Sequence, residues 1–435
     1  MTIDIKDMLK DKINNRKIFK NLDVLLPSYV PTIPVHREEE IKKITNVITP
    51  IALNEKPHNL FIYGKTGTGK TCIARYVTEE VRSFLENPAD NVHGVKAVVV
   101  YLNSRIYDTE YQILTNIVKD KGLNHEDFIN TPLGNNFKIE GSSHTTLYEK
   151  LKEVVYNNGL NLVIILDEID MIRKGFDNLI YKLTRVNDEI GNLNGKNNSK
   201  KITSRGYVTL IGISNNAKVK EKLDQRSKST LWEEDIIFEP YTAPQLADIL
   251  EQRIKEGFQE GVVGGEIITR AAAYAAQDGD ARHALRLLEK AGRLADEKGA
   301  ISVEPGDVSA AKGIVERDIL VEMSTSLPEQ QRIVMYAISQ MAIKGGEYRR
   351  LGECSKGTLT SGEAYEGYER LCHRMNIKPK TMRQFGNYLN ELDTYSLINI
   401  KIAGKGYRGN TRLIKLAFSP SDVEDILKNS LGLSD

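Results

Sequence analysis

The sequence predicts an α/β domain with a parallel sheet, followed by a small helical domain and a C-terminal winged-helix domain. Three observations lead to this fold class. A short apolar strand, a glycine loop and a helix follow one another at residues 60–77, and an apolar run at residues 162–166 ends in acidic residues. After Pro240 the chain turns helical and alanine-rich, and beyond residue 325 it predicts three helices and a strand hairpin.

Length and composition set the first limits. At 435 residues the chain exceeds one ordinary hydrophobic core, which predicts two or three domains. Because the net charge is +1, any surface for nucleic acid must be local. The three cysteines, Cys72, Cys354 and Cys372, lack C-x-x-C spacing, which favours free thiols in a reducing compartment. Without a signal core or a run of about 18 apolar residues, we expect a cytoplasmic protein with no membrane partner.

The N-terminal residues lead into the first domain. Residues 1–23, rich in Lys, Asn and Asp, predict a mobile arm. Residues 24–38 hold three prolines, which predict an extended lead-in. A helix is expected at about 38–54, where apolar residues recur at helical spacing. The first domain is predicted to span residues 24–239.

The segment from residue 60 to residue 71 has the order that a phosphate site requires. It fits the pattern G-x-x-x-x-G-K-[ST] between a strand and a helix, and its candidate ligands are Gly64, Thr66, Gly67, Thr68, Gly69, Lys70 and Thr71. Glycines let backbone N–H groups surround phosphates, and the helix N-terminus adds its positive dipole end. We expect Lys70 to reach the outer phosphates and Thr71 to bind Mg²⁺, so the sequence predicts binding of ATP or ADP.

A second buried strand is predicted at 97–103, and acidic residues follow the third strand. Five apolar residues, 162–166, are typical of a central parallel strand buried on both faces. Asp167 and Glu168 then lie at its carboxyl end, where open α/β sheets hold ligands. We expect Asp167 to bind Mg²⁺, and Glu168 to orient and deprotonate the attacking water. A further strand at 207–213 precedes Asn215, a candidate sensor of the γ-phosphate, while polar residues 191–205 predict a mobile loop.

Two further domains follow. Helices are expected at 245–256, 266–277, 281–298 and 305–322, which predicts a helical domain over 240–322. Asp280 would cap the third of these and put Arg282 on its first turn. Over 325–435 we expect a winged helix, with helices at 328–343, 361–375 and 379–392 and strands at 397–402 and 411–418. Ten Lys or Arg against two acids lie between residues 370 and 415, which favours binding to the DNA backbone.

Together these motifs resemble an AAA+ ATPase. The flanking segments 34–38, 183–187, 240–246, 279–285 and 362–365 further resemble archaeal origin-recognition and helicase-loading initiators, relatives of the eukaryotic origin recognition complex. The resemblance covers roughly residues 24–430. It implies an initiator that binds double-stranded origin DNA and helps load the replicative helicase, with other copies or paralogues on DNA and slow ATP hydrolysis as a switch.

The resemblance also assigns residue roles. Asn215 is similar to the sensor-one residue, Arg282 to the sensor-two arginine, and Arg226 to an arginine finger that acts on a neighbouring subunit. Nucleotide contacts are implied for Val35, Arg37, Tyr241 and Arg253. The implied DNA contacts are Arg383 and Gln384 on the recognition helix, and Lys405, Tyr407, Arg408 and Arg412 in the wing. The sequence departs from the family at its long loop 191–205 and at Gln225, where proline is common.

Two other functions remain open at this level. One is a winged-helix transcriptional regulator whose ATPase module controls DNA affinity. The other is an AAA+ machine that acts on protein, such as a clamp loader or a remodeller, which the basic wing disfavours. An inverted-repeat site beside the gene would favour the initiator.

Overall fold

The computed structural model describes residues 17–123, 139, 141–194, 206–231, 233–344, 357–395, 397–402 and 412–433. The chain divides into two compact units, Met1–Val308 and Ser309–Asp435, which are described in turn.

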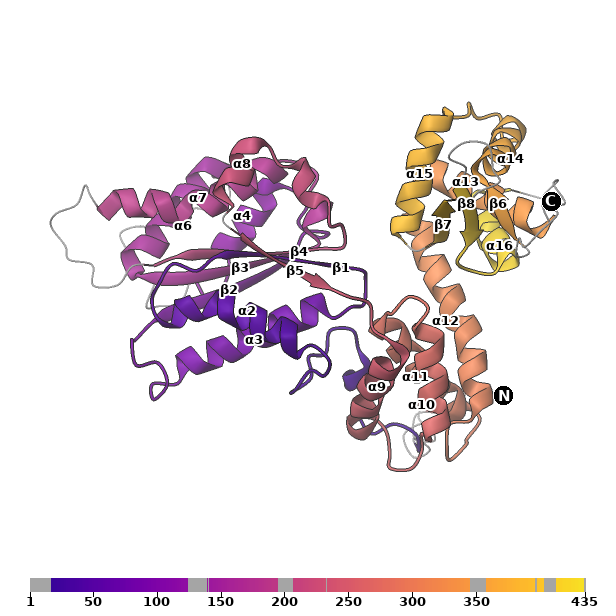
Figure 1. Ribbon diagram of the computed structural model, residues 1–435, viewed down its shortest axis with the longest axis horizontal. Coiled ribbons are helices and arrows are strands. Elements are labelled where there is room, and N and C mark those ends of the chain that lie inside the picture. The colour runs from indigo at the N-terminus through magenta and orange to yellow at the C-terminus, as the bar shows by residue number, and fades with distance from the viewer. Residues whose placement is uncertain are drawn as a thin grey trace, which may run out of the picture. The chain divides into compact units, whose positions relative to one another are not determined.

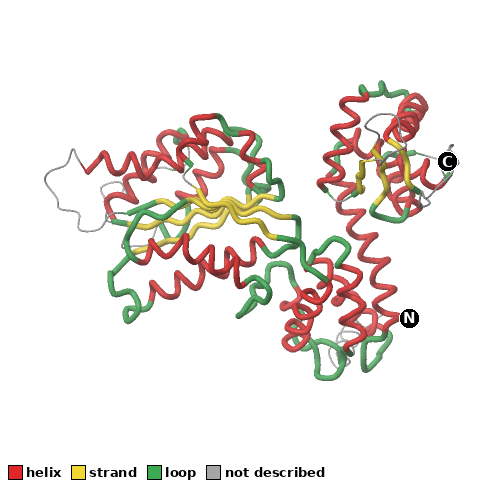
Figure 2. The backbone as a smooth tube through the Cα atoms, in the orientation of Figure 1, coloured by secondary structure: helices red, strands yellow, loops and turns green. Residues whose placement is uncertain are grey.

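The first unit is built around a parallel sheet of five strands in the order β2-β3-β4-β1-β5 (Figure 1, Figure 2). The strands are β1 (Asn59–Gly64), β2 (Lys96–Asn103), β3 (Leu160–Asp167), β4 (Val208–Ser214) and β5 (Glu233–Phe238). Every neighbouring pair runs parallel, and β3 is buried over its whole length. The predicted parallel sheet is therefore confirmed, and β5 is an addition to it.

Helices cover both faces of this sheet (Figure 1). On one face lie α2 (Glu38–Ala52) and α3 (Lys70–Glu86), and on the other lie α4 (Glu110–Val118), α6 (His144–Asn158), α7 (Phe176–Asn194) and α8 (Gln225–Thr230). Since successive strand side chains point to opposite faces, Leu60 and Ile62 join one apolar cluster while Phe61 joins the other. Short 3₁₀ turns, η2 (Ile169–Met171) and η3 (Val219–Lys222), follow β3 and β4.

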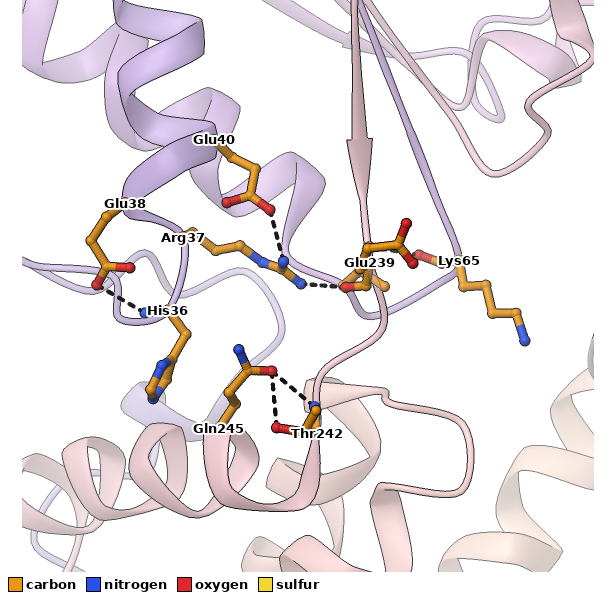
Figure 3. Close-up of polar contacts among 9 residues, drawn as sticks. His36, Arg37, Glu38, Glu40, Lys65, Glu239, Thr242 and Gln245 are labelled. Atoms are coloured by element: carbon orange, nitrogen blue, oxygen red, sulfur yellow. Dashed lines mark hydrogen bonds and ion pairs between the residues drawn. The ribbon is translucent and has the colours of Figure 1, made fainter.

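The helical part that follows forms the lid of the first unit. It consists of α9 (Ala243–Gly257), α10 (Gly265–Ala275), α11 (Ala281–Glu297) and the start of α12 (Pro305–Ser326), close to the predicted ranges. Thr242 begins α9, where the Gln245 side chain accepts from its backbone N–H at 2.9 Å (Figure 3). Asp280 caps α11 by accepting from the N–H groups of Arg282 and His283.

The chain before the sheet packs on the lid. Ile18 and Phe19 are buried, and the Phe19 ring lies 4.8 Å from that of Phe258. Lys20 N–H donates to the Gly257 carbonyl at 2.8 Å. A 3₁₀ turn, η1 (Asp23–Leu25), follows. The sequence led us to expect a mobile arm over 1–23, but residues 17–23 are anchored because their apolar side chains have a surface to cover; residues 1–16 lie outside the described part.

The second unit has the winged-helix arrangement. It contains the end of α12, then α13 (Glu329–Ile343), α14 (Ser361–Arg374), α15 (Met382–Thr394) and α16 (Pro420–Ser430). An antiparallel sheet in the order β6-β8-β7 joins β6 (Thr358–Thr360), β7 (Ile398–Ile402) and β8 (Arg412–Leu416). Tyr368, Phe385 and Ile414 are fully buried in its core. The sequence did not lead us to expect β6 and α16. No helix within the described ranges is long and apolar enough to cross a bilayer.

Candidate nucleotide site

The glycine loop connects β1 to α3. Gly67 and Gly69 have φ angles of 73° and 91°, and Gly69 directly precedes the first residue of α3. A Cβ at Gly69 would lie 2.7 Å from the Tyr241 hydroxyl, so a side chain is excluded by contact as well as by conformation. Thr68 is fully buried and donates through Oγ1 to the Lys65 carbonyl at 2.9 Å. The loop is thereby shaped by its own contacts and by the lid.

Lys70 is held by the loop itself. Its Nζ donates to the carbonyls of Gly64 and Lys65 at 2.7 and 2.6 Å, and the residue is 6% exposed. Burial, with a smaller contribution from Arg282, lowers the pKa of Lys70 to about 8, while Asp167 and other carboxylates oppose the shift. The ammonium thus lies beside the loop on which the phosphates are expected.

The two predicted Mg²⁺ ligands lie together. Thr71 Oγ1 donates to Asp167 Oδ2 at 2.7 Å, and the Tyr101 hydroxyl donates to the same oxygen at 2.8 Å. Burial raises the pKa of Tyr101, so its hydroxyl stays protonated. A hydroxyl and a carboxylate are the hard oxygen donors that Mg²⁺ takes from proteins, alongside phosphates and water. The residues therefore fit this ion, and Tyr101 is a contact that sequence reasoning missed.

Glu168 combines an unusual backbone with a partly buried carboxylate. Its φ is 52°, in the left-handed region, and its N–H donates to Asp167 Oδ1 at 2.9 Å. Oε2 is buried without a hydrogen-bond partner in the described residues, with Arg105 Nε at 4.0 Å. Burial raises the pKa of Glu168 and the Arg105 charge opposes the rise. A carboxylate in this setting is suited to accept a proton.

The sensor candidates lie at different places. Asn215 follows β4, which pairs with both β3 and β1, so it lies between the acidic strand end and the glycine loop. The neighbouring Ser214 donates to Asp170 Oδ1 at 2.7 Å. Arg282 is on the first turn of α11, as predicted. Arg226 is exposed on α8, whose cap Asp224 accepts from the Ser227 N–H.

A cavity of about 330 Å³ lies beside the glycine loop and the carboxyl end of β3. Core and lid both line it, and its predicted site residues are Val35, Gly67, Gly69, Thr71, Asp167, Glu168, Tyr241, Arg253 and Arg282. Its described lining residues do not include Arg37, Gly64, Thr66, Thr68, Lys70, Asn215 or Arg226. A site of this volume is within the usual range for small ligands, about 300–1,000 Å³.

On the lid side, Arg253 lines the cavity and is 6% exposed. Its guanidinium lies 4.7 Å from the centre of the Tyr29 ring, while Nε and Nη1 have no hydrogen-bond partner in the described residues. Burial lowers its pKa. A buried guanidinium with unsatisfied donors is suited to bind an anionic or polar ligand.

Arg37 lies at the junction of core and lid, and a Cβ placed at Gly69 would lie 3.9 Å from its Nε. Arg37 donates to Glu40 Oε1 at 2.9 Å and to the Glu239 carbonyl at 2.6 Å (Figure 3). The guanidinium carbon also lies 4.0 Å from the centre of the Tyr241 ring. Arg37 therefore joins the first core helix to the connection between core and lid.

The lid also contacts the glycine loop directly. Ala281 N–H donates to the Gly67 carbonyl at 3.1 Å, and a Cβ at Gly67 would lie 1.7 Å from Asp280 Oδ1. The position of α11 is thus tied to the conformation of the loop. No sequence pattern predicts this contact between Ala281 and Gly67.

In the second unit, the structure describes three of the six predicted DNA-contacting residues. Arg383 and Gln384 are exposed on the first turn of α15. Arg412 begins β8 and donates to Asn390 Oδ1 on α15 at 2.8 Å. Lys405, Tyr407 and Arg408 lie outside the described residues.

Comparison with known proteins identifies the family. Residues 34–193 match the AAA ATPase domain, residues 247–313 the Cdc6 AAA+ ATPase-type lid domain, and residues 322–426 the CDC6 C-terminal winged helix domain. The chain is 37% identical to the ORC1-type DNA replication protein of Thermococcus kodakarensis over 98% of its own length and 94% of the relative. The chain belongs to the ORC1-type DNA replication proteins. It is accordingly a replication initiator with an AAA+ ATPase domain and a winged helix.

Other family members are similar over nearly the whole chain. The ORC1-type DNA replication protein 1 of Sulfurisphaera tokodaii is 36% identical, with 96% of this chain and 95% of that protein covered. Among solved structures, the Aeropyrum pernix ORC1 protein in complex with DNA is 33% identical, with a TM-score of 0.67 and 95% and 97% of the two chains covered. The predicted fold class, ATPase domain and DNA-replication family are thereby confirmed.

Proposed function

We propose that this initiator binds origin DNA, helps load the replicative helicase, and uses ATP binding and slow hydrolysis as a switch. The observation that carries the switch is that core and lid line one cavity around the glycine loop and Asp167. A nucleotide in this cavity touches both parts, so gain or loss of its γ-phosphate changes the contacts between them.

The chemistry assigned to the site is hydrolysis of ATP to ADP and phosphate. Glu168 orients a water and takes its proton as the water oxygen attacks the γ-phosphorus, and the bond from that phosphorus to the bridging oxygen of ADP breaks. Thr71 and Asp167 would hold Mg²⁺, which neutralises phosphate charge when bound. Lys70, Asn215 and Arg282 contact the phosphates. Lys70 is held in place before nucleotide binds, because its Nζ donates hydrogen bonds to two carbonyls of the loop.

Neighbouring subunits are proposed to complete the site. Arg226 is exposed and is not among the described residues that line the cavity of its own chain. An arginine so placed supplies its charge to a nucleotide held by another copy or a paralogue on DNA. Turnover is then slow in the isolated protein and faster in the assembly.

The winged helix is proposed to bind origin DNA, which the structure of the Aeropyrum pernix ORC1 protein in complex with DNA supports. Arg383 and Gln384, exposed at the start of α15, would reach base edges in the major groove. Arg412, Lys405, Tyr407 and Arg408 would contact the backbone from the wing.

Footprinting on genomic DNA, followed by helicase recruitment, tests this proposal. We expect protection of a recurring inverted repeat, and retention of purified replicative helicase on that DNA with ATP but not with Lys70→Ala protein. Protection confined to promoters, with no helicase retained in any nucleotide state, would instead identify a transcriptional regulator.

A further inference from the structure

A groove in the second unit lies between α13 and α14. Its volume is about 500 Å³, and its described lining comes from residues 337–344 and 367–374 alone. Neither α15 nor β8, which carry the described candidate DNA contacts, contributes to this described lining. Arg370 and Arg374 in this α13–α14 groove belong to the basic stretch 370–415, but the function proposed above assigns them no contact.

The groove has an apolar floor and a cationic rim. Ala337, Met341 and Gly367 form the buried floor. The cations of the rim are exposed Lys344, Arg370 and Arg374, with His373 beside them, and the described lining residues include no Asp or Glu. Long basic side chains above a recessed apolar surface are complementary to an acidic segment that carries an apolar side chain.

One of the rim charges is held in position. Gln340 accepts from Arg374 Nη2 at 3.1 Å through its amide oxygen. The amide nitrogen of Gln340 donates to the Tyr336 hydroxyl at 3.1 Å and lies 3.3 Å from Glu424 Oε1. The amide is thus fixed on both sides, and it holds the Arg374 guanidinium through one hydrogen bond.

The geometry disfavours two other anionic ligands. Both α13 and α14 present their carboxyl-terminal halves here, so no helix N-terminus is available to hold a free phosphate. A duplex presents a smooth charged backbone, which has no apolar group to fill a recess over Met341. A protein segment supplies both the acidic and the apolar groups.

We propose that the α13–α14 groove binds an acidic segment of a partner protein through an apolar side chain on its floor and carboxylates at its rim. A volume of about 500 Å³ lies within the range of sites that enclose small ligands, about 300–1,000 Å³, which suits a few side chains of an extended peptide. The affinity should fall with salt because the rim charges are exposed.

A displayed library of random 12-residue peptides, selected on the full-length protein, provides the probe. The test variant is Arg370→Glu/Arg374→Glu. The control is Lys42→Glu/Lys43→Glu, which changes the net charge equally at two exposed positions of α2. We expect enriched peptides to be acidic with an apolar residue, and to bind the test variant at least tenfold more weakly but the control within about twofold.

Two further measurements separate the alternatives. Met341→Ala should weaken the selected peptides while leaving their salt dependence intact, because it removes floor area and no charge. Duplex DNA should bind the test variant and the control alike. Selected peptides without an acidic surplus, or with equal affinity for the test variant and the wild type, would overturn the proposal. So would a tenfold loss of duplex affinity with peptide binding unchanged, which would make the groove a DNA contact.

Discussion

Replacing Arg37 by methionine tests whether this side chain supports the fold or binds nucleotide. The guanidinium side chain is 5% exposed, and Glu40, which it neutralises, is 16% exposed. Removing one partner of a buried ion pair leaves a charge without compensation and typically costs about 3–5 kcal/mol. Because Glu40 keeps some contact with water and methionine preserves the stem, we expect a loss near the lower limit, about 3 kcal/mol.

Chemical denaturation followed by circular dichroism measures this loss. The transition of the first unit should move to lower denaturant concentration, while that of the second unit serves as an internal control and stays in place. Arg37→Met/Glu40→Gln should recover part of the loss, since glutamine removes the uncompensated charge. An unchanged first transition together with a tenfold loss of ATP affinity would refute this reasoning and make Arg37 a nucleotide ligand, as the family resemblance implies.

Three further predictions concern turnover and charge. Because the pKa of Lys70 is lowered to about 8 from its ordinary 10.5, its burial destabilises the nucleotide-free protein below pH 8, and this cost is relieved as pH rises from 8 to 10.5. ATP binding should return the proton to Lys70, so the affinity for ATP should fall above about pH 8. Calorimetry at pH 9 in two buffers of different ionisation enthalpy should then show proton uptake on binding. If no proton is taken up, the pKa of Lys70 is not lowered. Glu168→Gln should keep ATP affinity and lose about 10²–10⁴ in turnover, measured as phosphate release, and a wild-type rate would exclude its role as base. Arg226→Ala should leave ATP affinity of the isolated chain intact and abolish the stimulation of turnover by assembly on DNA, whereas weaker ATP binding by the isolated chain would place Arg226 in its own site.

The sequence could predict those parts of the molecule that local patterns encode. The glycine loop, the apolar β3 with Asp167 at its end, and the cap at Asp280 each depend on a few neighbouring residues, and each is found where predicted. Contacts between distant segments could not be predicted in this way. Tyr101 reaches Asp167 through the register of β2 on β3, and Ile18 is buried by a lid that begins more than 200 residues later. Contacts of this kind depend on how distant segments pack together, and the pattern of a single segment carries no information about that packing.

The course of the chain between lid and core has a mechanical consequence. The polypeptide contacts the lid at Phe19 and Tyr29, passes into the core near Arg37, and returns to the lid after Glu239. The lid is therefore attached to the core by one covalent connection after Glu239 and by the N-terminal segment packed on it, and Arg37 bonds these two attachments to each other. A body held at two adjacent points keeps rotation about the line that joins them and loses most of its freedom to slide or detach. The lid should accordingly swing about a single axis, and after a proteolytic cut near residue 239 it should stay bound to the core only through the packed segment 17–29.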